Sequence, residues 1–167
     1  WRGHADRAEG TFAAEKEVVQ RIGVHTRLPT LWADDVSEAL AQVEPGETKA
    51  VYLDGPHYEG APTRIYAWFG LPEGAHADAT VPGIVLVHGG GGTAYRQWVD
   101  RWTAQGYAAM AIAVEGQTDT AATEADEAGG QAVGGWRRHA MSGPARVGAY
   151  GDADRPIEAQ WMYHATA

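Results

Sequence analysis

The chain has 167 residues, 44% of them hydrophobic, with seven Trp, seven Tyr and no Cys. This length allows one domain with a core, the aromatic content argues against disorder, and the lack of Cys excludes disulfides, thiol catalysis and cysteine-ligated metal. A formal net charge of -9 argues against nucleic acid as a partner, and no apolar run approaches the roughly 18 residues of a membrane span.

The composition leaves the cellular compartment unknown, with secretion or the periplasm as candidates. No signal peptide is recognisable, and the chain begins at Trp1 rather than Met. We therefore expect a processed or trimmed product that has lost an upstream segment.

The N-terminal part is weakly patterned. Thr11–Arg21 and Ser37–Val43 each show a short helical pattern, and a Pro-Gly pair at 45–46 ends the second. We expect residues 1–46 to form a peripheral arm and residues 47–167 to form the main domain.

Two segments that follow alternate apolar and polar side chains. They are KAVYLDG at 49–55 and TRIYAWFG at 63–70. A period of two between Gly and Pro residues predicts two antiparallel strands, each half buried. The joining segment, Asp54–Pro62, is too long for a two-residue turn.

The pattern changes at Ile84–Val87, a continuous apolar run typical of a parallel strand covered on both faces. After four glycines, apolar side chains at helical spacing predict a helix ended by Gly106, with Trp98 and Trp102 in the core. The predicted stripe is Tyr95, Trp98, Val99 and Trp102. A second apolar run, Tyr107–Val114, completes a strand-helix-strand unit with a right-handed crossover.

The remainder of the chain has little periodicity. Residues 116–155 are acidic at first and then rich in glycine, and we interpret them as a lid-like loop beside a ligand cleft. A helical pattern opens at Pro156 and continues to Ala167, so we expect the domain to be incomplete at its C-terminus.

The glycine turn, which we define as His88–Gly92, follows a predicted strand and precedes a predicted helix. This arrangement offers backbone N–H groups near a helix N-terminus, where negative charge is favoured. Two ligands use it: a dinucleotide pyrophosphate, and the oxyanion that forms when an acyl carbonyl is attacked.

The dinucleotide interpretation has a literal sequence match. Gly89, Gly91 and Ala94 satisfy G-x-G-x-x-A, and Glu115 closes the next strand where a ribose-binding acid would lie. Four successive glycines satisfy many templates, however, and this interpretation leaves His88 unexplained.

The oxyanion interpretation accounts for His88, because HGGG-type motifs supply an oxyanion-hole N–H after the third strand of α/β-hydrolases. The sequence from Val51 to Glu115 resembles the acetyl xylan esterase and dienelactone-hydrolase-like branch of that superfamily. The most similar stretches are YLDGP at 52–56, PTRIYAWFGLP at 62–72 and PGIVLVHGGGGTAYRQWVDRWTAQGYAAMAI at 82–112. The closing WMYHA at 161–165 resembles the helix before the nucleophile strand of such enzymes.

The resemblance implies the N-terminal part of an α/β-hydrolase fold, a mainly parallel α/β sheet preceded by antiparallel strands. It implies a carboxylic ester hydrolase, and an acetylated carbohydrate is one candidate for the ester substrate. It implies no cofactor. Gly89, Gly90 and Gly91 would form the oxyanion hole, with His88 ordering the turn. Residues expected to line the substrate cleft are Glu115, Trp136, Trp161 and Tyr163.

The resemblance also implies a Ser nucleophile in G-x-S-x-G, an acid and a histidine, none of which can be placed. Ser37 lies in a helical pattern, and Ser142 has no glycine two residues before it. We therefore expect this chain to be inactive alone, with the triad on a second polypeptide or missing segment. The histidines show no metal-ligand spacing. A non-catalytic interaction fragment is a third interpretation.

Overall fold

The computed structural model describes residues 40–76, 80–146, 154 and 160–162. Most of the arm predicted for residues 1–46, including the helix expected at Thr11–Arg21, lies outside these ranges. Tyr163 and most of the last predicted helix also lie outside them.

A long hairpin opens the described part of the chain. Strands β1 (Thr48–Tyr58) and β2 (Ala61–Gly70) pair antiparallel, as the alternation predicts. The expected long connection is wrong, because both strands continue past their alternating segments and leave only Glu59 and Gly60 between them. These two residues have φ values of 50° and 82°, the left-handed conformation that tight hairpin turns require. A register shift between Gly55 and Tyr58 bends β1 near Pro56.

The predicted strand-helix-strand unit is present. Strand β3 (Gly83–Val87) leads through the glycine turn to helix α3 (Arg96–Thr103), and strand β4 (Ala108–Ile112) pairs parallel with β3. Gly106, with φ of 85°, lies in the turn between α3 and β4. On its other side β4 pairs antiparallel with the second half of β2, so the strand order is β1-β2-β4-β3.

The expected mainly parallel α/β sheet is wrong. The four-stranded sheet is mixed, with β3–β4 as its one parallel pairing among the described strands, and a second sheet is wholly antiparallel. The described chain is therefore mostly β with few helices. Strand β3 is also an edge strand whose Val85 and Val87 are 61% and 44% exposed, so its apolar run is not covered on both faces.

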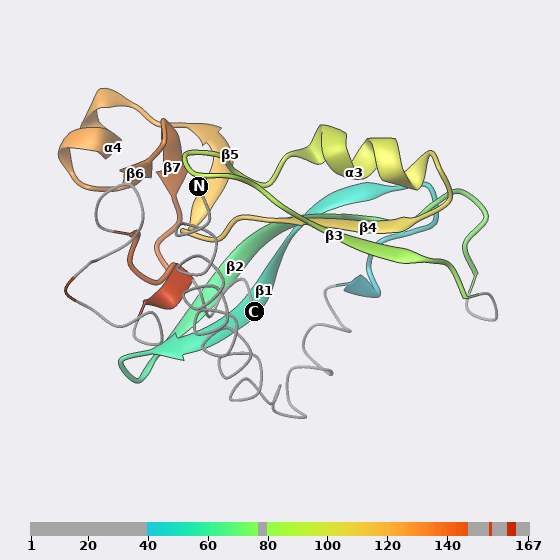
Figure 1. Cartoon of the computed structure of the whole chain (residues 1–167), viewed down its shortest axis with the longest axis horizontal. Helices are drawn as coiled ribbons and strands as arrows, with labels where there is room; N and C mark the ends of the chain where they lie inside the picture. The colour runs from blue at the N-terminus through green and yellow to red at the C-terminus, as the bar shows by residue number, and fades with distance from the viewer. Residues whose placement is uncertain (1–39, 77–79, 147–153, 155–159, 163–167) are drawn as a thin grey trace, which may run out of the picture.

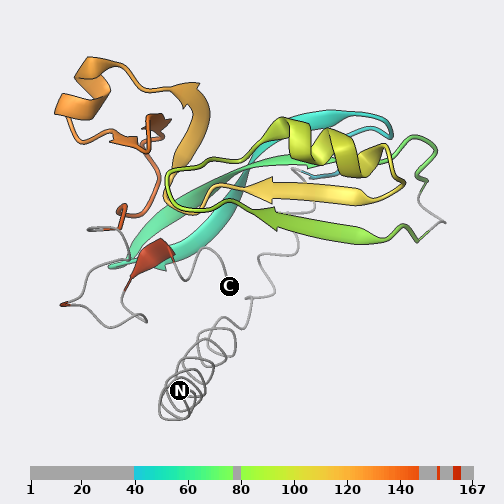
Figure 2. The same cartoon turned by 45° about the horizontal axis from the view of Figure 1, so that its top comes forward.

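The second sheet is built from the segment interpreted as a lid-like loop. Strands β5 (Gln117–Ala121), β6 (Ala132–Val133) and β7 (Trp136–Arg138) pair antiparallel in the order β5-β7-β6. Helix α4 (Glu124–Ala128) begins with a capping box in which Thr123 and Asp126 exchange hydrogen bonds. Figures 1 and 2 show this sheet and α4 grouped at one end of the larger sheet.

The core divides between the two faces of the larger sheet, because successive side chains of a strand point to opposite faces. Helix α3 covers one face, where Val99 is fully buried and Trp102 partly buried, while Trp98 is half-buried against Tyr95. The other face packs beneath Trp161, whose Nε1 donates to Thr63 Oγ1 at 3.0 Å. The buried residues of this second cluster are Val43, Val51, Ile65, Ala67, Ile112, Val114 and Trp161.

Within the described ranges, none of the helices combines the length and apolar character that crossing a bilayer requires.

Packing of α3 gives the first testable prediction. Val99→Ala removes two methyl groups from a site with 0% exposure and should lower the free energy of unfolding by about 2 kcal/mol. Val85→Ala, the matched control, removes two methyl groups from a 61% exposed position and should change the free energy of unfolding by less than about 0.5 kcal/mol. Urea denaturation measures both. Equal losses would contradict the burial of α3 against the sheet.

Candidate functional site

The glycine turn is a tight reversal at the end of β3. The N–H of Gly92 donates to the carbonyl of Gly89 at 3.1 Å, and Gly91 has φ of 76°. Glycine is favoured at residue 91 because other residues rarely adopt this conformation. A Cβ added to Gly92 would lie 2.9 Å from Cβ of His88, so the turn folds closely onto the histidine.

His88 joins the turn to the adjacent strand. Its Nε2 accepts the N–H of Val114 at 3.3 Å, and its Nδ1 lies 2.7 Å from the carbonyl oxygen of Gly89. Because Nε2 is the acceptor, the neutral ring must carry its proton on Nδ1, which donates to Gly89. The side chain is 7% exposed. His88 thus holds the first glycine in place from inside the protein.

The turn presents backbone donors. Within the described ranges, the N–H groups of Gly89, Gly90 and Gly91 have no hydrogen-bond acceptor, and Gly89 and Gly90 are exposed. The expected position at a helix N-terminus is not observed, because α3 begins at Arg96 with Tyr95 as its N-cap. The helix dipole acts mainly within the first turn of a helix, so its contribution at Gly89 and Gly90 is reduced.

The second sheet packs against the glycine turn. Gly134, in the β6–β7 turn, approaches Gly91 so closely that a Cβ at residue 134 would overlap the backbone of residue 91. Thr93 Oγ1 donates to the carbonyl of Thr118 in β5 at 2.9 Å. The ring of Trp136 in β7 lies edge-on to that of Tyr95, with centroids 6.1 Å apart.

A buried ion pair lies beside the turn. Glu115 is 1% exposed; its Oε1 accepts the backbone N–H of Arg146 at 3.1 Å and forms an ion pair with Nε of Arg146 at 3.3 Å. The Glu115 N–H donates to Gln117 Oε1 at 2.9 Å, and Arg138 Nε donates to the Glu115 carbonyl at 2.9 Å. Burial lowers the pKa of Arg138, while the charge of Glu115 opposes that shift.

The structure brings together some of the predicted site residues and separates others. His88, Gly89, Gly90 and Gly91 form the turn. Glu115 is connected to it through Arg146, and Trp136 lies in β7 of the sheet that packs on it. Trp161 lies instead in the core, 1% exposed. The sequence reasoning missed Arg146, whose guanidinium packs on Gly90. The sequence offered one signal for this role: Arg146 is a basic residue in the glycine-rich segment that comes after Glu115.

Ser142 does not have the surroundings of an activated nucleophile. Its Oγ donates to the carbonyl of His139 at 2.9 Å, and it lies in the segment after β7. A backbone carbonyl cannot remove the hydroxyl proton, and nucleophilic catalysis needs a base within hydrogen-bond reach. Ser37 lies outside the described residues.

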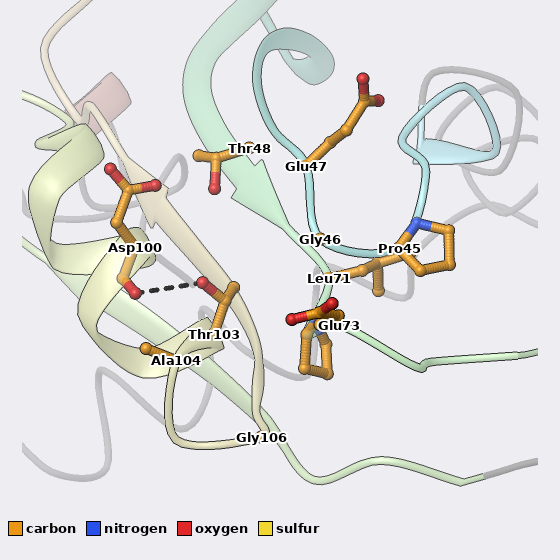
Figure 3. Close-up of a pocket in the computed structure, with 11 residues that line it drawn as sticks. Pro45, Gly46, Glu47, Thr48, Leu71, Glu73, Asp100, Thr103, Ala104 and Gly106 are labelled. Carbon is orange, nitrogen blue, oxygen red and sulfur yellow. Dashed lines mark hydrogen bonds between the residues drawn. The ribbon is translucent and has the colours of Figure 1, made fainter.

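The chain also has an open groove with a volume of about 790 Å³, which is lined by residues at the start of β1, the end of β2 and the C-terminal end of α3. Figure 3 shows its carboxylates, of which Glu47 is paired with Lys49 at 2.7 Å and Asp100 with Arg96 at 3.5 Å. The lining residues are Pro45, Gly46, Glu47, Thr48, Leu71, Pro72, Glu73, Asp100, Thr103, Ala104 and Gly106. This groove contains none of the predicted site residues.

His139 lies near a smaller cavity of about 180 Å³ bordered also by Tyr52, Arg64 and Met141. Its ring is edge-on to that of Tyr52, with centroids 5.2 Å apart. Burial, together with the charge of Arg138, lowers the pKa of His139 to about 4. The ring is therefore neutral at pH 7.

Among the described residues, no group of three or more His, Asp or Glu side chains is arranged to hold a metal ion. Comparison of the chain with protein-family models, curated proteins and solved structures finds no match.

The contact between glycines gives a second prediction. Gly134→Ala and Gly135→Ala both place a side chain at positive φ, 59° and 81°, but only the first also meets the backbone of Gly91. We expect Gly135→Ala to cost about 1 kcal/mol of unfolding free energy and Gly134→Ala about 2 kcal/mol or more. Thermal and urea denaturation measure the difference. Equal losses would show that the second sheet does not press on the turn.

The lowered pKa of His139 gives a third prediction. Between pH 6.5 and pH 4 the unfolded chain binds a proton at this residue and the folded chain does not, so acid favours unfolding. Because the ring is only half-buried, we expect this residue to account for about 1 kcal/mol of lost stability. Denaturation of wild type and His139→Gln at pH 7 and pH 5 tests it. Identical pH dependence in both proteins would contradict a neutral, half-buried ring with a lowered pKa.

Proposed function

We propose that the glycine turn is the oxyanion-binding part of a serine-type carboxylic ester hydrolase. The nucleophile, acid and catalytic histidine are supplied by a segment outside these 167 residues. The observation that carries the proposal is the set of N–H groups at Gly89, Gly90 and Gly91, which have no acceptor among the described residues on a turn fixed by His88. The resemblance of residues 82–112 to acetyl xylan esterases suggests an acetylated carbohydrate as substrate.

The chemistry needs fixed donors. When a serine oxygen attacks the ester carbon, the carbonyl oxygen gains negative charge, and N–H groups already aimed at that position stabilise it without reorganising. Loss of one such donor costs about 3–4 kcal/mol in comparable sites. A turn held at Gly89 by His88 and at Gly91 by Gly134 has the rigidity that this role requires.

The dinucleotide alternative has less support. A ribose-binding acid must present its carboxylate to the ligand, whereas Glu115 is 1% exposed and its carboxylate binds Arg146. The pyrophosphate of a dinucleotide also lies at a helix N-terminus, and α3 begins only at Arg96. Titration with NAD or NADP remains a simple check, and saturable binding would favour this alternative.

The proposal predicts that activity belongs to an assembly. We expect the chain, purified natively from its source, to carry a second polypeptide with G-x-S-x-G in intact-mass analysis. The assembly should hydrolyse p-nitrophenyl acetate, and the isolated chain should not. His88→Ala should lower kcat of the assembly by about 10- to 100-fold with little change in KM, because it releases donors needed mainly in the transition state.

Two variants serve as controls for that experiment. His57→Ala, at an exposed position of β1, should retain activity. Ser142→Ala should also retain it, because the Ser142 hydroxyl faces a backbone carbonyl. Hydrolysis by the isolated chain that disappears in Ser142→Ala would overturn the proposed division of the catalytic groups.

A further inference from the structure

Arg146 places a cation against the glycine turn. A Cβ added to Gly90 would lie 2.6 Å from Nη2 and 2.9 Å from Nη1 of Arg146, so the guanidinium occupies the space that a side chain at residue 90 would need. Gly90 itself is exposed, and the Arg146 side chain is 22% exposed. The guanidinium therefore lies against the glycine at the protein surface.

Glu115 fixes the orientation of this guanidinium. Its Oε1 accepts the backbone N–H of the arginine and forms an ion pair with Nε of the same residue at 3.3 Å, which holds the side chain near both its backbone and its inner nitrogen. The terminal nitrogens are then the arginine atoms nearest Gly90. Because Glu115 is 1% exposed, this anchor is shielded from water.

We propose that Arg146 is the charged member of the oxyanion-binding site, acting on the same oxygen as the N–H groups of Gly89 and Gly90. The inference rests on the proposed function of the turn. The helix that would favour negative charge begins several residues after the turn, and the guanidinium supplies positive charge at contact distance instead. Charge-assisted hydrogen bonds are roughly twice as strong as neutral ones, so a guanidinium would add to the stabilisation that the neutral N–H groups give the same oxygen.

The test uses the full chain and acetate, the carboxylate that an acetyl ester releases. In 15N spectra at constant ionic strength, acetate should shift the amides of Gly89 and Gly90 and the Nε–H of Arg146 with one common Kd. Arg146→Gln should weaken binding about tenfold, and Arg146→Lys should weaken it less. Arg137→Gln, which removes an equal charge from an exposed position paired with Asp126, should leave the Kd unchanged.

The outcomes separate the two proposals. If acetate moves the glycine amides equally in wild type and in folded Arg146→Gln, the role of Arg146 is wrong while that of the turn stands. If acetate moves no glycine amide in wild type, the oxyanion function of the turn fails, and the role of Arg146 with it. Should Arg146→Gln unfold, the wild-type Nε–H resonance decides: no shift there while the glycine amides shift would overturn the inference.

Discussion

The geometry of the glycine turn depends on one imidazole ring. The parallel pairing of β3 with β4 ends at Val87 and Ile112, so the next backbone groups of β4 need other partners. Val114 donates to Nε2 of His88, and Nδ1 of the same ring binds the carbonyl of Gly89. The histidine therefore replaces a sheet hydrogen bond with a side-chain bond. The glycine turn can therefore depart from the end of β3 while the N–H of Val114 keeps a hydrogen-bond partner.

The second sheet supports the turn from outside. Close contact between Gly134 and Gly91 is possible only because Gly134 lacks a side chain, and the positive φ of both residues suits glycine as well. The ion pair adds a constraint of a different kind, because a buried carboxylate is costly without a partner. Burial of Glu115 thus calls for a charged partner, which is Arg146, and the guanidinium of this arginine also lies against Gly90.

Local patterns predicted the local structure, and long-range pairing decided the rest. Alternation along residues 51–53 and 64–69 was enough for the β1–β2 hairpin, and helical spacing at 95–102 was enough for α3. The fold class could not be predicted from local patterns, because the antiparallel partner of β4 is β2, a strand far back in the sequence. Its residues Trp68 and Phe69 pair with Ala111 and Met110, which follow them by 43 (111 − 68) and 41 (110 − 69) positions. An apolar run also cannot distinguish a central strand from an edge strand such as β3.

Only the residues of the candidate site that are neighbours in sequence could be predicted. His88 and the glycines adjoin one another in sequence, whereas the anchor of Arg146 joins residues 31 positions apart and no periodic pattern connects them. That distant pair places a charged group beside the turn. Glu115 and Arg146 form an oriented dipole with its positive end at Gly90. If the turn binds an anion as proposed, exposed acids farther than about 10 Å away are screened by salt in this chain of net charge -9, so a charge at contact distance has the larger effect on that anion.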